Sequence, residues 1–316
     1  MNIIKFVSES LFIDDKDLLS FAATAPYRYK KYYIDKRNGT GQRLIAHPSK
    51  ELKFIQRLVV DFIGEKLFVH EASFAYKSGV GIKDNALVHV KSKYLLKMDF
   101  EDFFNSITPV LLFRVLKRQG VNFNAVERKF LDNILFFRKL RGGALRLSVG
   151  APSSPIISNV VMYYFDTVIE EYCKENKINY SRYADDITFS TNIKGVLFLV
   201  PAIVTEALNE ETYGKVSVNN KKTVFSSKAH NRHVTGITLS NDGILSIGRD
   251  RKRLISSMVH RYSNNLLSEE DIAKLIGILS FSHNIEPEFV TRLNKKYGWS
   301  IMSNLVSEKM TTLVND

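Results

Sequence analysis

The sequence predicts an α+β protein. Segments whose apolar residues recur at helical spacing alternate irregularly with short apolar segments of strand character. No internal repeat with a period of about 20 to 50 residues is visible, which argues against a solenoid or a propeller. Of the 316 residues, 45% are hydrophobic and 25% are charged, so the chain can bury a large core. This composition excludes an intrinsically disordered or collagen-like chain.

The N-terminal part of the chain predicts two helices separated by a hairpin. Residues 14–25 and 49–67 carry apolar side chains at helical spacing, and the second segment follows Pro48 directly. Residues 32–46 form a strand-like segment around Asn38-Gly39-Thr40-Gly41, and asparagine and glycine tolerate the backbone conformations of a tight turn. We therefore expect a helix, a hairpin and a helix in this order.

The middle of the chain predicts short strands beside acidic residues. Residues 94–99 read as a buried strand that runs into residues 100–107. A turn rich in proline and serine at 150–155 precedes a strongly apolar helical segment at 156–172. Residues 178–191 are predicted to form two strands that flank an acidic turn.

The C-terminal part predicts more strands and then helices. Residues 215–239 have strand character, and we expect a domain boundary near residues 241–243. From Arg249 onward the pattern is helical and polar, with later helical segments at 274–281 and 289–297.

The chain is basic, with 45 lysines and arginines against 33 aspartates and glutamates, a formal net charge of +12 and an isoelectric point near 9.5. Such a charge favours a polyanionic partner, either a nucleic acid or an anionic membrane surface. Between residues 27 and 57, tyrosines separate many lysines and arginines, which suits phosphate contacts beside base stacking. An ordinary solvated surface shows the same pattern, so this segment supports nucleic-acid binding without proving it.

Cysteine content and hydropathy indicate the compartment. A single cysteine, Cys173, cannot form an intramolecular disulfide, which fits a reducing environment. The longest apolar run, Val196–Val204, is interrupted by Pro201 and is too short for a hydrocarbon core of about 30 Å. Residues 1–10 lack the long apolar segment of a signal peptide. We expect a cytoplasmic protein that does not enter a membrane.

The strongest chemical signal is Tyr183-Ala184-Asp185-Asp186, which places two adjacent carboxylates in a turn between two predicted strands. Carboxylates at such close range raise each other's pKa unless a cation or an arginine neutralises them. Aspartate is also a common residue of exposed turns, so this tetrapeptide alone does not establish a site.

A second acidic segment changes this interpretation. Asp99 ends the predicted strand at residues 94–99 and is followed by Phe100. Nucleotidyl transfer uses two Mg²⁺ ions about 3.5 to 4 Å apart, held by carboxylates from separate strands. Asp99, Asp185 and Asp186 supply such a set, and Mg²⁺ needs no histidine or cysteine cage. The two segments together predict a centre for two Mg²⁺ ions.

On the basis of these acidic residues and the motifs below, the chain resembles retron-type reverse transcriptases, which have a right-hand polymerase fold with an antiparallel palm sheet. The matching motifs follow one another in the order of that family. They are Arg43-Leu44-Ile45-Ala46-His47-Pro48 of the fingers, Asp99 to Phe104 (motif A), Gly150 to Pro155 (motif B), Tyr183 to Asp186 (motif C) and Asn219 to Thr223 (motif D). Asn85-Ala86-Leu87-Val88-His89 and Val234-Thr235-Gly236 resemble segments found in retron enzymes specifically.

The resemblance implies a role for each motif residue. Asp99, Asp185 and Asp186 would be catalytic and would hold two Mg²⁺ ions, with the Phe100 carbonyl as a further ligand. The residues that would contact the incoming deoxynucleoside triphosphate are Arg43, Phe104, Gly150, Ala151 and Lys222. The residues that would contact the cognate RNA are Asn85, His89, Val234, Thr235, Gly236, Arg249, Arg251 and Arg253.

The resemblance also implies a division into fingers, palm and thumb. Residues 1–93 and 107–146 would form the fingers. Residues 94–106, with motif A, and residues 147–241, with motifs B, C, D and the Val-Thr-Gly segment, would form the palm. Residues 242–316 would form a helical thumb that recognises RNA.

The activity implied is that of an RNA-directed DNA polymerase that uses its own structured noncoding RNA as primer and template. Synthesis would begin at a guanosine 2′-hydroxyl of that RNA and would yield a short branched RNA–DNA, called msDNA. Retrons are associated with phage defence, so an effector protein (a toxin) is a further implied partner.

Two alternatives stay open at this point. A reverse transcriptase of the intron-maturase type would share the palm motifs, although the chain ends soon after one thumb-sized helical segment. An inactive RNA-binding scaffold would not need three clustered carboxylates beside a polyanion. The chain also departs from the family pattern, because Val149 stands where most relatives have glutamine before the motif B glycine. A side-chain amide is thereby missing near the nascent base pair.

Overall fold

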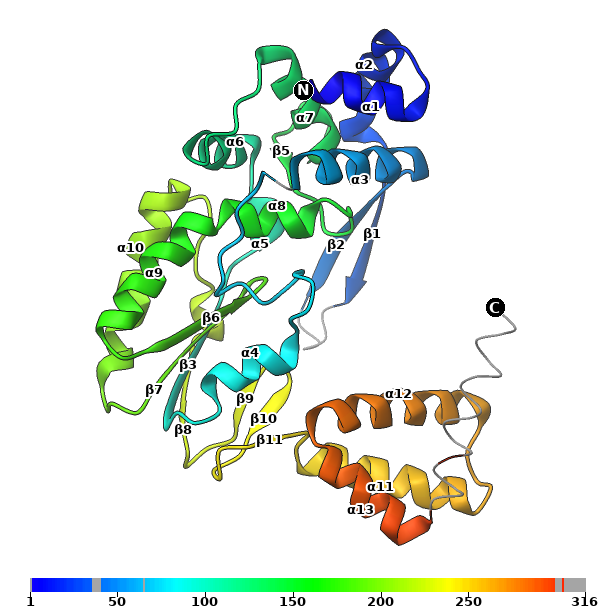
Figure 1. Cartoon of the computed structure of the whole chain (residues 1–316), viewed down its shortest axis with the longest axis vertical. Helices are drawn as coiled ribbons and strands as arrows, with labels where there is room; N and C mark the ends of the chain where they lie inside the picture. The colour runs from blue at the N-terminus through cyan, green and yellow to red at the C-terminus, as the bar shows by residue number, and fades with distance from the viewer. Residues whose placement is uncertain (1, 36–40, 65, 299–302, 304–316) are drawn as a thin grey trace. The chain divides into compact units, whose positions relative to one another are not determined.

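The computed structural model describes residues 2–35, 41–64, 66–298 and 303. Helices and strands alternate irregularly along the chain, so the predicted α+β class is confirmed (Figure 1). The chain divides into two compact units. The first consists of Met1–Val80 and Leu96–Phe225, and the second of Gly81–Leu95 and Ser226–Asp316.

The N-terminal elements follow the predicted order of helix, hairpin and helix. They are α1 (Ile3–Leu11), α2 (Asp15–Thr24), β1 (Tyr29–Asp35), β2 (Gln42–Pro48) and α3 (Lys50–Gly64). β1 and β2 pair antiparallel, with Tyr29 opposite Pro48. Most of the predicted turn, Asn38 to Thr40, lies outside the described residues. Helix α1 was not predicted from the sequence; the Asn2 side chain caps its first turn by accepting a hydrogen bond from the Ile4 amide.

A group of short elements follows motif A. It consists of α5 (Phe103–Ser106), α6 (Pro109–Arg118), α7 (Ala125–Leu135) and the two-residue strands β4 (Phe137–Arg138) and β5 (Leu145–Arg146). Helix α6 starts at a proline, where the missing amide hydrogen costs nothing. Helix α7 starts with a capping box between Asn124 and Glu127.

The apolar segment predicted as one helix at 156–172 is two helices. They are α8 (Ser154–Val161) and α9 (Tyr163–Glu175), which are separated at Met162. Neither glycine nor proline marks the break, so periodicity alone does not locate it. Tertiary packing decides it, because Met162 is completely buried.

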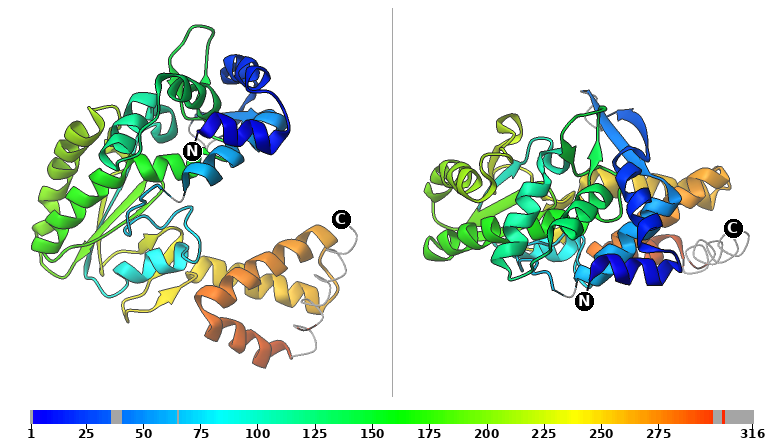
Figure 2. Two further views of the ribbon diagram at one scale, coloured as in Figure 1. Left: turned by 45° about the horizontal axis from the view of Figure 1, so that its top comes forward. Right: turned by 90° about the horizontal axis from the view of Figure 1, so that it is seen from above.

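A four-stranded sheet carries both acidic segments. Its strand order is β6 (Asn179–Tyr183), β7 (Asp186–Thr191), β3 (Tyr94–Asp99) and β8 (Val224–Ser227). Helix α9 and helix α10 (Val200–Thr212) lie side by side against this sheet in the views of Figures 1 and 2. Leu96, Ile187 and Phe189 are completely buried in the sheet. The sheet therefore provides a rigid base for the residues at its strand ends.

Among the described residues, the second unit packs a small sheet and four helices around its own apolar core. Its strands are β9 (Arg232–Val234), β10 (Ile237–Leu239) and β11 (Leu245–Ser246), and its helices are α4 (Ile82–His89), α11 (Arg249–Ser263), α12 (Glu269–Ile285) and α13 (Pro287–Tyr297). The helical pattern predicted from Arg249 onward is confirmed as far as the structure describes it.

Residues 241–243, where we expected a domain boundary, connect β10 to β11 inside the second unit, whereas the two units divide after Phe225. The division into fingers, palm and thumb stays a prediction. Within the described ranges, no helix has the length and apolar character needed to cross a bilayer.

Candidate active site

Asp99 and the pair Asp185 and Asp186 come together at neighbouring strand ends. Strand β3 ends at Asp99, and strands β6 and β7 are joined by the two-residue turn Ala184-Asp185. The Phe100 backbone amide donates a hydrogen bond to the Asp185 carbonyl oxygen at 3.0 Å. A direct hydrogen bond thus joins the two acidic segments, which are distant in sequence.

Burial and the proximity of these carboxylates raise the pKa values of Asp185 and Asp186. Desolvation, assisted by the negative charge of Asp99, raises the pKa of Asp185. Desolvation together with the charges of Asp185 and Asp99 raises the pKa of Asp186 to about 6. The positive charges of Arg43 and Lys222 partly oppose the rise at Asp185. The cluster therefore has excess negative charge that a cation can neutralise.

Lys222 lies directly on this cluster. Its ammonium Nζ donates to Asp99 Oδ1 at 2.9 Å and to Oδ2 at 2.8 Å. The Asn219 amide donates to the Asp99 carbonyl oxygen at 2.7 Å, which ties the motif D segment to the end of β3. The Lys222 side chain is 48% exposed, so an approaching anion can contact it. Its predicted contact with a triphosphate is not tested by this geometry.

The donor set fits Mg²⁺. Mg²⁺ keeps several water ligands and takes only one or two carboxylates together with substrate phosphates. Asp99 at the end of β3 and Asp185 in the turn between β6 and β7 offer two carboxylates, and Asp186 at the start of β7 adds a third. Across the described residues there is no ready-made group of three or more acidic, histidine or cysteine side chains that could hold a metal alone. The site thus suits an ion that depends on its substrate and water for the remaining ligands. The Phe100 carbonyl as a ligand stays a prediction.

A buried ion pair supports the Ala184-Asp185 turn. The guanidinium of Arg182 donates to Asp166 Oδ1 at 2.9 Å from Nε and to Asp166 Oδ2 at 2.6 Å from Nη2. Both side chains are completely buried. The Tyr180 hydroxyl donates to the same carboxylate at 2.7 Å. Burial of this pair is tolerable because hydrogen bonds satisfy the charges.

The third nitrogen of the same guanidinium reaches the turn. Arg182 Nη1 donates to the Ala184 carbonyl oxygen at 3.2 Å and to Asn159 Oδ1 at 3.1 Å. Ala184 has a positive φ of 57°, a conformation that costs a non-glycine residue free energy. Asp166, Asn159 and Arg182 were not among the site residues predicted from the sequence. Two features of the sequence could have indicated them. Asn159 and Asp166 are polar residues within the apolar helical segment, and Arg182 directly precedes the acidic tetrapeptide.

Motif B packs against β2. The Ala46 amide donates to the Val149 carbonyl oxygen at 2.9 Å, so Val149 contributes its backbone here. Gly150 has φ +120°, and a Cβ at this position would lie 2.8 Å from His47 Cδ2 and 3.3 Å from the Ala46 oxygen. Packing against β2 thus explains the glycine. Ala151 is buried, and the nucleotide contacts predicted for Gly150 and Ala151 stay predictions.

Replacing Gly150 by alanine is expected to lower the free energy of unfolding by about 1 to 3 kcal/mol, because it adds a clash to an unfavourable φ. Gly142→Ala is the matched control, since Gly142 also has a positive φ (+77°) but nothing lies within 4 Å of its Cβ position. Urea denaturation of both variants measures the difference. Equal losses in both variants would show that the contact with β2 is unimportant.

Arg43 and Phe104 lie near the acidic cluster. Arg43 is an exposed residue of β2, and its charge acts on Asp185. Phe104 of α5 is partly exposed, whereas the adjacent Phe103 is 3% exposed and packs on Phe100 with ring centroids 5.3 Å apart. Phe103 is therefore a core residue, and Phe104 is the ring that a ligand can reach.

The two retron-specific segments meet in the second unit. Asn85 Nδ2 donates to Thr235 Oγ1 at 3.5 Å, and Thr235 Oγ1 donates to the Ile82 carbonyl oxygen at 3.2 Å. Burial lowers the pKa of His89 to about 3, so this side chain is neutral at pH 7. Asn85, His89 and Val234 are at most 1% exposed, so their side chains hold α4 against β9 and β10. Contact with RNA at these residues, and at the exposed Gly236, stays a prediction.

The arginines at the start of α11 differ in accessibility. Arg249 and Arg253 are exposed. Arg251 Nη1 donates to the Gly236 carbonyl oxygen at 3.4 Å, and its guanidinium lies 4.9 Å from the centre of the Phe281 ring. Arg249 and Arg253 are therefore the more available of the three for phosphate contacts.

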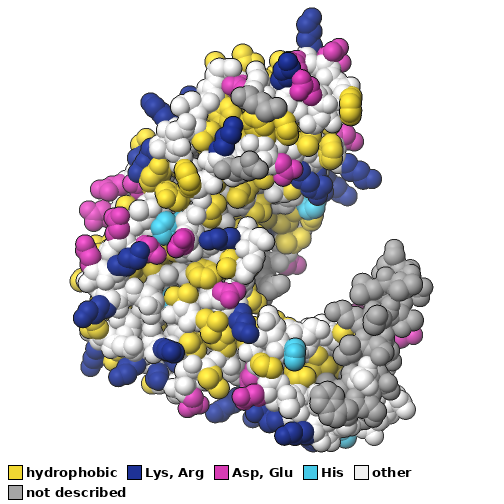
Figure 3. All heavy atoms as spheres, in the orientation of Figure 1, with side chains coloured by type: hydrophobic (Ala, Val, Ile, Leu, Met, Phe, Trp, Pro, Cys, Tyr) yellow, Lys and Arg dark blue, Asp and Glu magenta, His cyan; other side chains and the backbone are white. Residues whose placement is uncertain are grey.

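The basic segment at residues 27–57 forms an exposed surface in part. Along β1 every residue after Tyr29 is exposed, including Tyr32 at 41% and Tyr33 at 58%. In Figure 3, lysine and arginine side chains gather beside this hairpin and the start of α3. Lys36 and Arg37 lie outside the described residues. Exposed rings between cations fit the predicted nucleic-acid surface.

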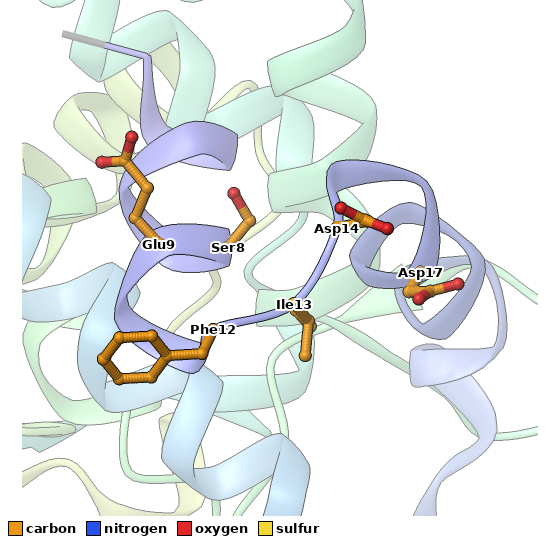
Figure 4. Close-up of a pocket in the computed structure, with 6 residues that line it drawn as sticks. All are labelled: Ser8, Glu9, Phe12, Ile13, Asp14 and Asp17. Carbon is orange, nitrogen blue, oxygen red and sulfur yellow. The ribbon is translucent and has the colours of Figure 1, made fainter.

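A separate hollow lies between α1 and α2, with Ser8, Glu9, Phe12, Ile13, Asp14 and Asp17 around it (Figure 4). None of these residues belongs to a predicted motif. The hollow is therefore no part of the acidic site.

The comparisons with known proteins agree with the motifs. Residues 34–239 match the family model described as reverse transcriptase (RNA-dependent DNA polymerase). Over 293 residues the chain is 48% identical to the Retron Ec83 reverse transcriptase of Escherichia coli, which covers 92% of this chain and 93% of that one. The chain belongs to the retron reverse transcriptases. It is also 31% identical to the Retron Ec73 reverse transcriptase of Escherichia coli, over 89% of this chain and 91% of that one.

Solved structures with a similar arrangement include a telomerase from Candida albicans, with a TM-score of 0.48, 15% identity and coverage of 87% of this chain and 56% of that one. A foamy viral protease-reverse transcriptase has a TM-score of 0.47 and 17% identity, over 88% of this chain and 39% of that one. Membership of the retron reverse transcriptases confirms the right-hand polymerase fold and the RNA-directed DNA polymerase activity. It decides against an intron-maturase type and an inactive scaffold.

Proposed function

We propose that this retron reverse transcriptase copies its own structured noncoding RNA into msDNA with two Mg²⁺ ions bound at Asp99, Asp185 and Asp186. The observation that carries the proposal is the convergence of these carboxylates beside Lys222 and Arg43 in a chain so similar to a retron enzyme. Deoxynucleoside triphosphates would be its substrates.

The metal ions, when bound, would activate the attacking hydroxyl and stabilise the leaving pyrophosphate. The protein's part is to position and neutralise charge. Asp99 at the end of β3 and Asp185 in the turn between β6 and β7 would hold the ions, and Asp186 would support them. Lys222 now neutralises Asp99, and its exposed ammonium would turn to the triphosphate once the ions take over that role. Arg43 would add a second positive charge for the same phosphates.

The test is to purify the full-length protein from cells that express the retron locus and to sequence the nucleic acid that remains bound. We expect a structured RNA joined to a short DNA through a guanosine 2′-oxygen. An active enzyme that copurifies with unrelated RNA and no branched DNA would contradict msDNA synthesis while leaving the polymerase activity intact.

The RNA partner is proposed to bind through the exposed arginines Arg249 and Arg253 of the second unit and through the basic surface along β1. Exchange of the segment from Gly248 to the C terminus for the same segment of a related retron enzyme should transfer the preference for a cognate RNA. Unchanged preference would contradict a thumb that reads the RNA. Because the chain belongs to the retron enzymes, we also propose that it acts in the cytoplasm. Its RNA–DNA complex would restrain an effector protein during phage defence.

Sugar selection is proposed to depend on Phe104. Its partly exposed ring would lie beneath the sugar of the incoming nucleotide and collide with a 2′-hydroxyl. Phe104→Ala is expected to incorporate ribonucleotides more readily while polymerisation continues, because a steric exclusion is relaxed. Phe103→Ala should instead lower the free energy of unfolding by about 3 to 5 kcal/mol, since that ring is buried.

The measurement is the ratio of kcat/KM for deoxynucleotides to that for ribonucleotides in both variants. An unchanged ratio in Phe104→Ala would remove this residue from sugar selection.

A further inference from the structure

Tyr76 is a strained and accessible aromatic residue beside the active site. Its φ is 59°, in the left-handed region that bulky residues rarely adopt, and its side chain is 51% exposed. Such strain persists only where the surrounding structure imposes it, and it is frequent at functional sites. No family motif quoted above includes Tyr76.

The segment before Tyr76 is held by the same network that supports the catalytic turn. The Arg182 amide donates to the Ala72 carbonyl oxygen at 2.7 Å, and the Phe74 amide donates to the Arg182 carbonyl oxygen at 2.8 Å. Asn159 Nδ2 donates to the Ala75 carbonyl oxygen at 2.8 Å, and the Ser73 hydroxyl donates to Asn159 Oδ1 at 2.8 Å. These bonds fix the backbone up to Ala75, so the unusual φ at Tyr76 has a rigid base.

The Tyr76 ring points to Phe104. The two ring centroids are 6.5 Å apart at an interplanar angle of 63°, an edge-to-face contact. Phe104 makes a second edge-to-face contact with Phe103, at 5.5 Å and 63°. Because Phe103 is buried, it serves as a fixed support. Tyr76 is then the second support of a ring that is otherwise partly exposed.

The tyrosine hydroxyl lies within the field of the reacting groups. Desolvation, and after it the charges of Asp185 and Tyr183, raise the pKa of Tyr76, whereas the charge of Arg43 lowers it. Tyr76 is thus close enough to Asp185 of motif C and to Arg43 of β2 to interact with their charges.

We propose that Tyr76 is a specificity-determining residue, which holds the Phe104 ring in the orientation that excludes a 2′-hydroxyl. The inference rests on the proposed role of Phe104 in sugar selection. Tyr76 acts through Phe104 and is therefore a positioning residue. Without the Tyr76 ring, Phe104 loses one of the two aromatic contacts found for it among the described residues, and it gains freedom to rotate away from the sugar.

The experiment measures kcat/KM for a deoxynucleotide and for the matching ribonucleotide in primer extension on an RNA template, with the full-length protein. Tyr76→Ala is expected to lower the deoxynucleotide preference by about two- to tenfold, the range that corresponds to one aromatic pair. Tyr76→Phe should keep the wild-type preference, because it keeps the ring. In a Phe104→Ala background, Tyr76→Ala should cause no further change, since the group it acts on is gone.

Tyr213→Ala is the matched control. Tyr213 also has a positive φ, 52°, and is 58% exposed. Its ring, however, packs against Arg114, whose guanidinium carbon Cζ lies 3.9 Å from the ring centroid. Its loss should leave the preference unchanged. An unchanged preference in Tyr76→Ala, or a change that adds to that of Phe104→Ala, would overturn the inference. If Phe104→Ala itself leaves the preference unchanged, the proposed role of Phe104 fails instead, while primer extension by the wild type still shows the polymerase.

Discussion

Asp185→Asn is expected to lower the rate of primer extension by about a hundred- to a thousandfold or more, with RNA affinity nearly unchanged. The substitution keeps the shape of the side chain and removes one charge from a cluster that holds the catalytic ions. RNA affinity depends instead on the basic surfaces, because phosphate contacts supply most of the binding free energy. Single-turnover extension with Mg²⁺ and RNA binding at matched salt measure the two quantities.

Asp102→Asn controls for charge removal in the same region. Asp102 is exposed, and Asn105 Nδ2 donates to its Oδ1 at 2.7 Å. Its φ of 44° suits asparagine as well. We expect Asp102→Asn to extend a primer at close to the wild-type rate. Extension by Asp185→Asn at the wild-type rate would refute the metal assignment.

Arg182→Met is expected to lower the free energy of unfolding by about 3 to 5 kcal/mol and to abolish activity with it. It leaves the buried Asp166 carboxylate without its counter-charge, and breaking a buried ion pair from one side has this cost. It also removes the donor to the Ala184 carbonyl oxygen, which holds the catalytic turn. Urea denaturation at equilibrium gives the free energy.

Asp166→Asn tests the same network in a milder way, because the amide keeps the shape and some hydrogen bonds. We expect a smaller loss of stability and a lower kcat at temperatures where the variant is fully folded. The matched control is Lys174→Ala, which breaks a pair on the same helix, α9, with Glu170. That lysine is 70% exposed, so the cost should be about 1 kcal/mol or less. Similar losses in Lys174→Ala and Arg182→Met would show that burial is unimportant here.

Much of the local structure could be predicted because it depends on short-range chemistry. The apolar run before Asp99 forms β3, and the acidic tetrapeptide spans the end of β6, the two-residue turn and the start of β7. The helix predicted at 49–67 was found at Lys50–Gly64, because its buried residues recur every three or four positions. Helices α1, α6 and α10 were not predicted, although α1 has an asparagine N-cap and α6 and α10 have a proline in their first turn. Those signals are short and common, so they are easily overlooked.

The sequence by itself determined the reaction class, since an ordered set of motifs with Asp99, Asp185 and Asp186 specifies which atoms are available. Only the tertiary structure decided how these atoms are held. Arg182 joins Asp166, Asn159 and the Ala184 carbonyl oxygen in one buried network. The tertiary structure also shows that position 150 must be glycine because β2 packs against it. The physical reason is that such contacts join residues far apart in the chain, and no periodicity or local motif encodes which distant partner satisfies a buried charge.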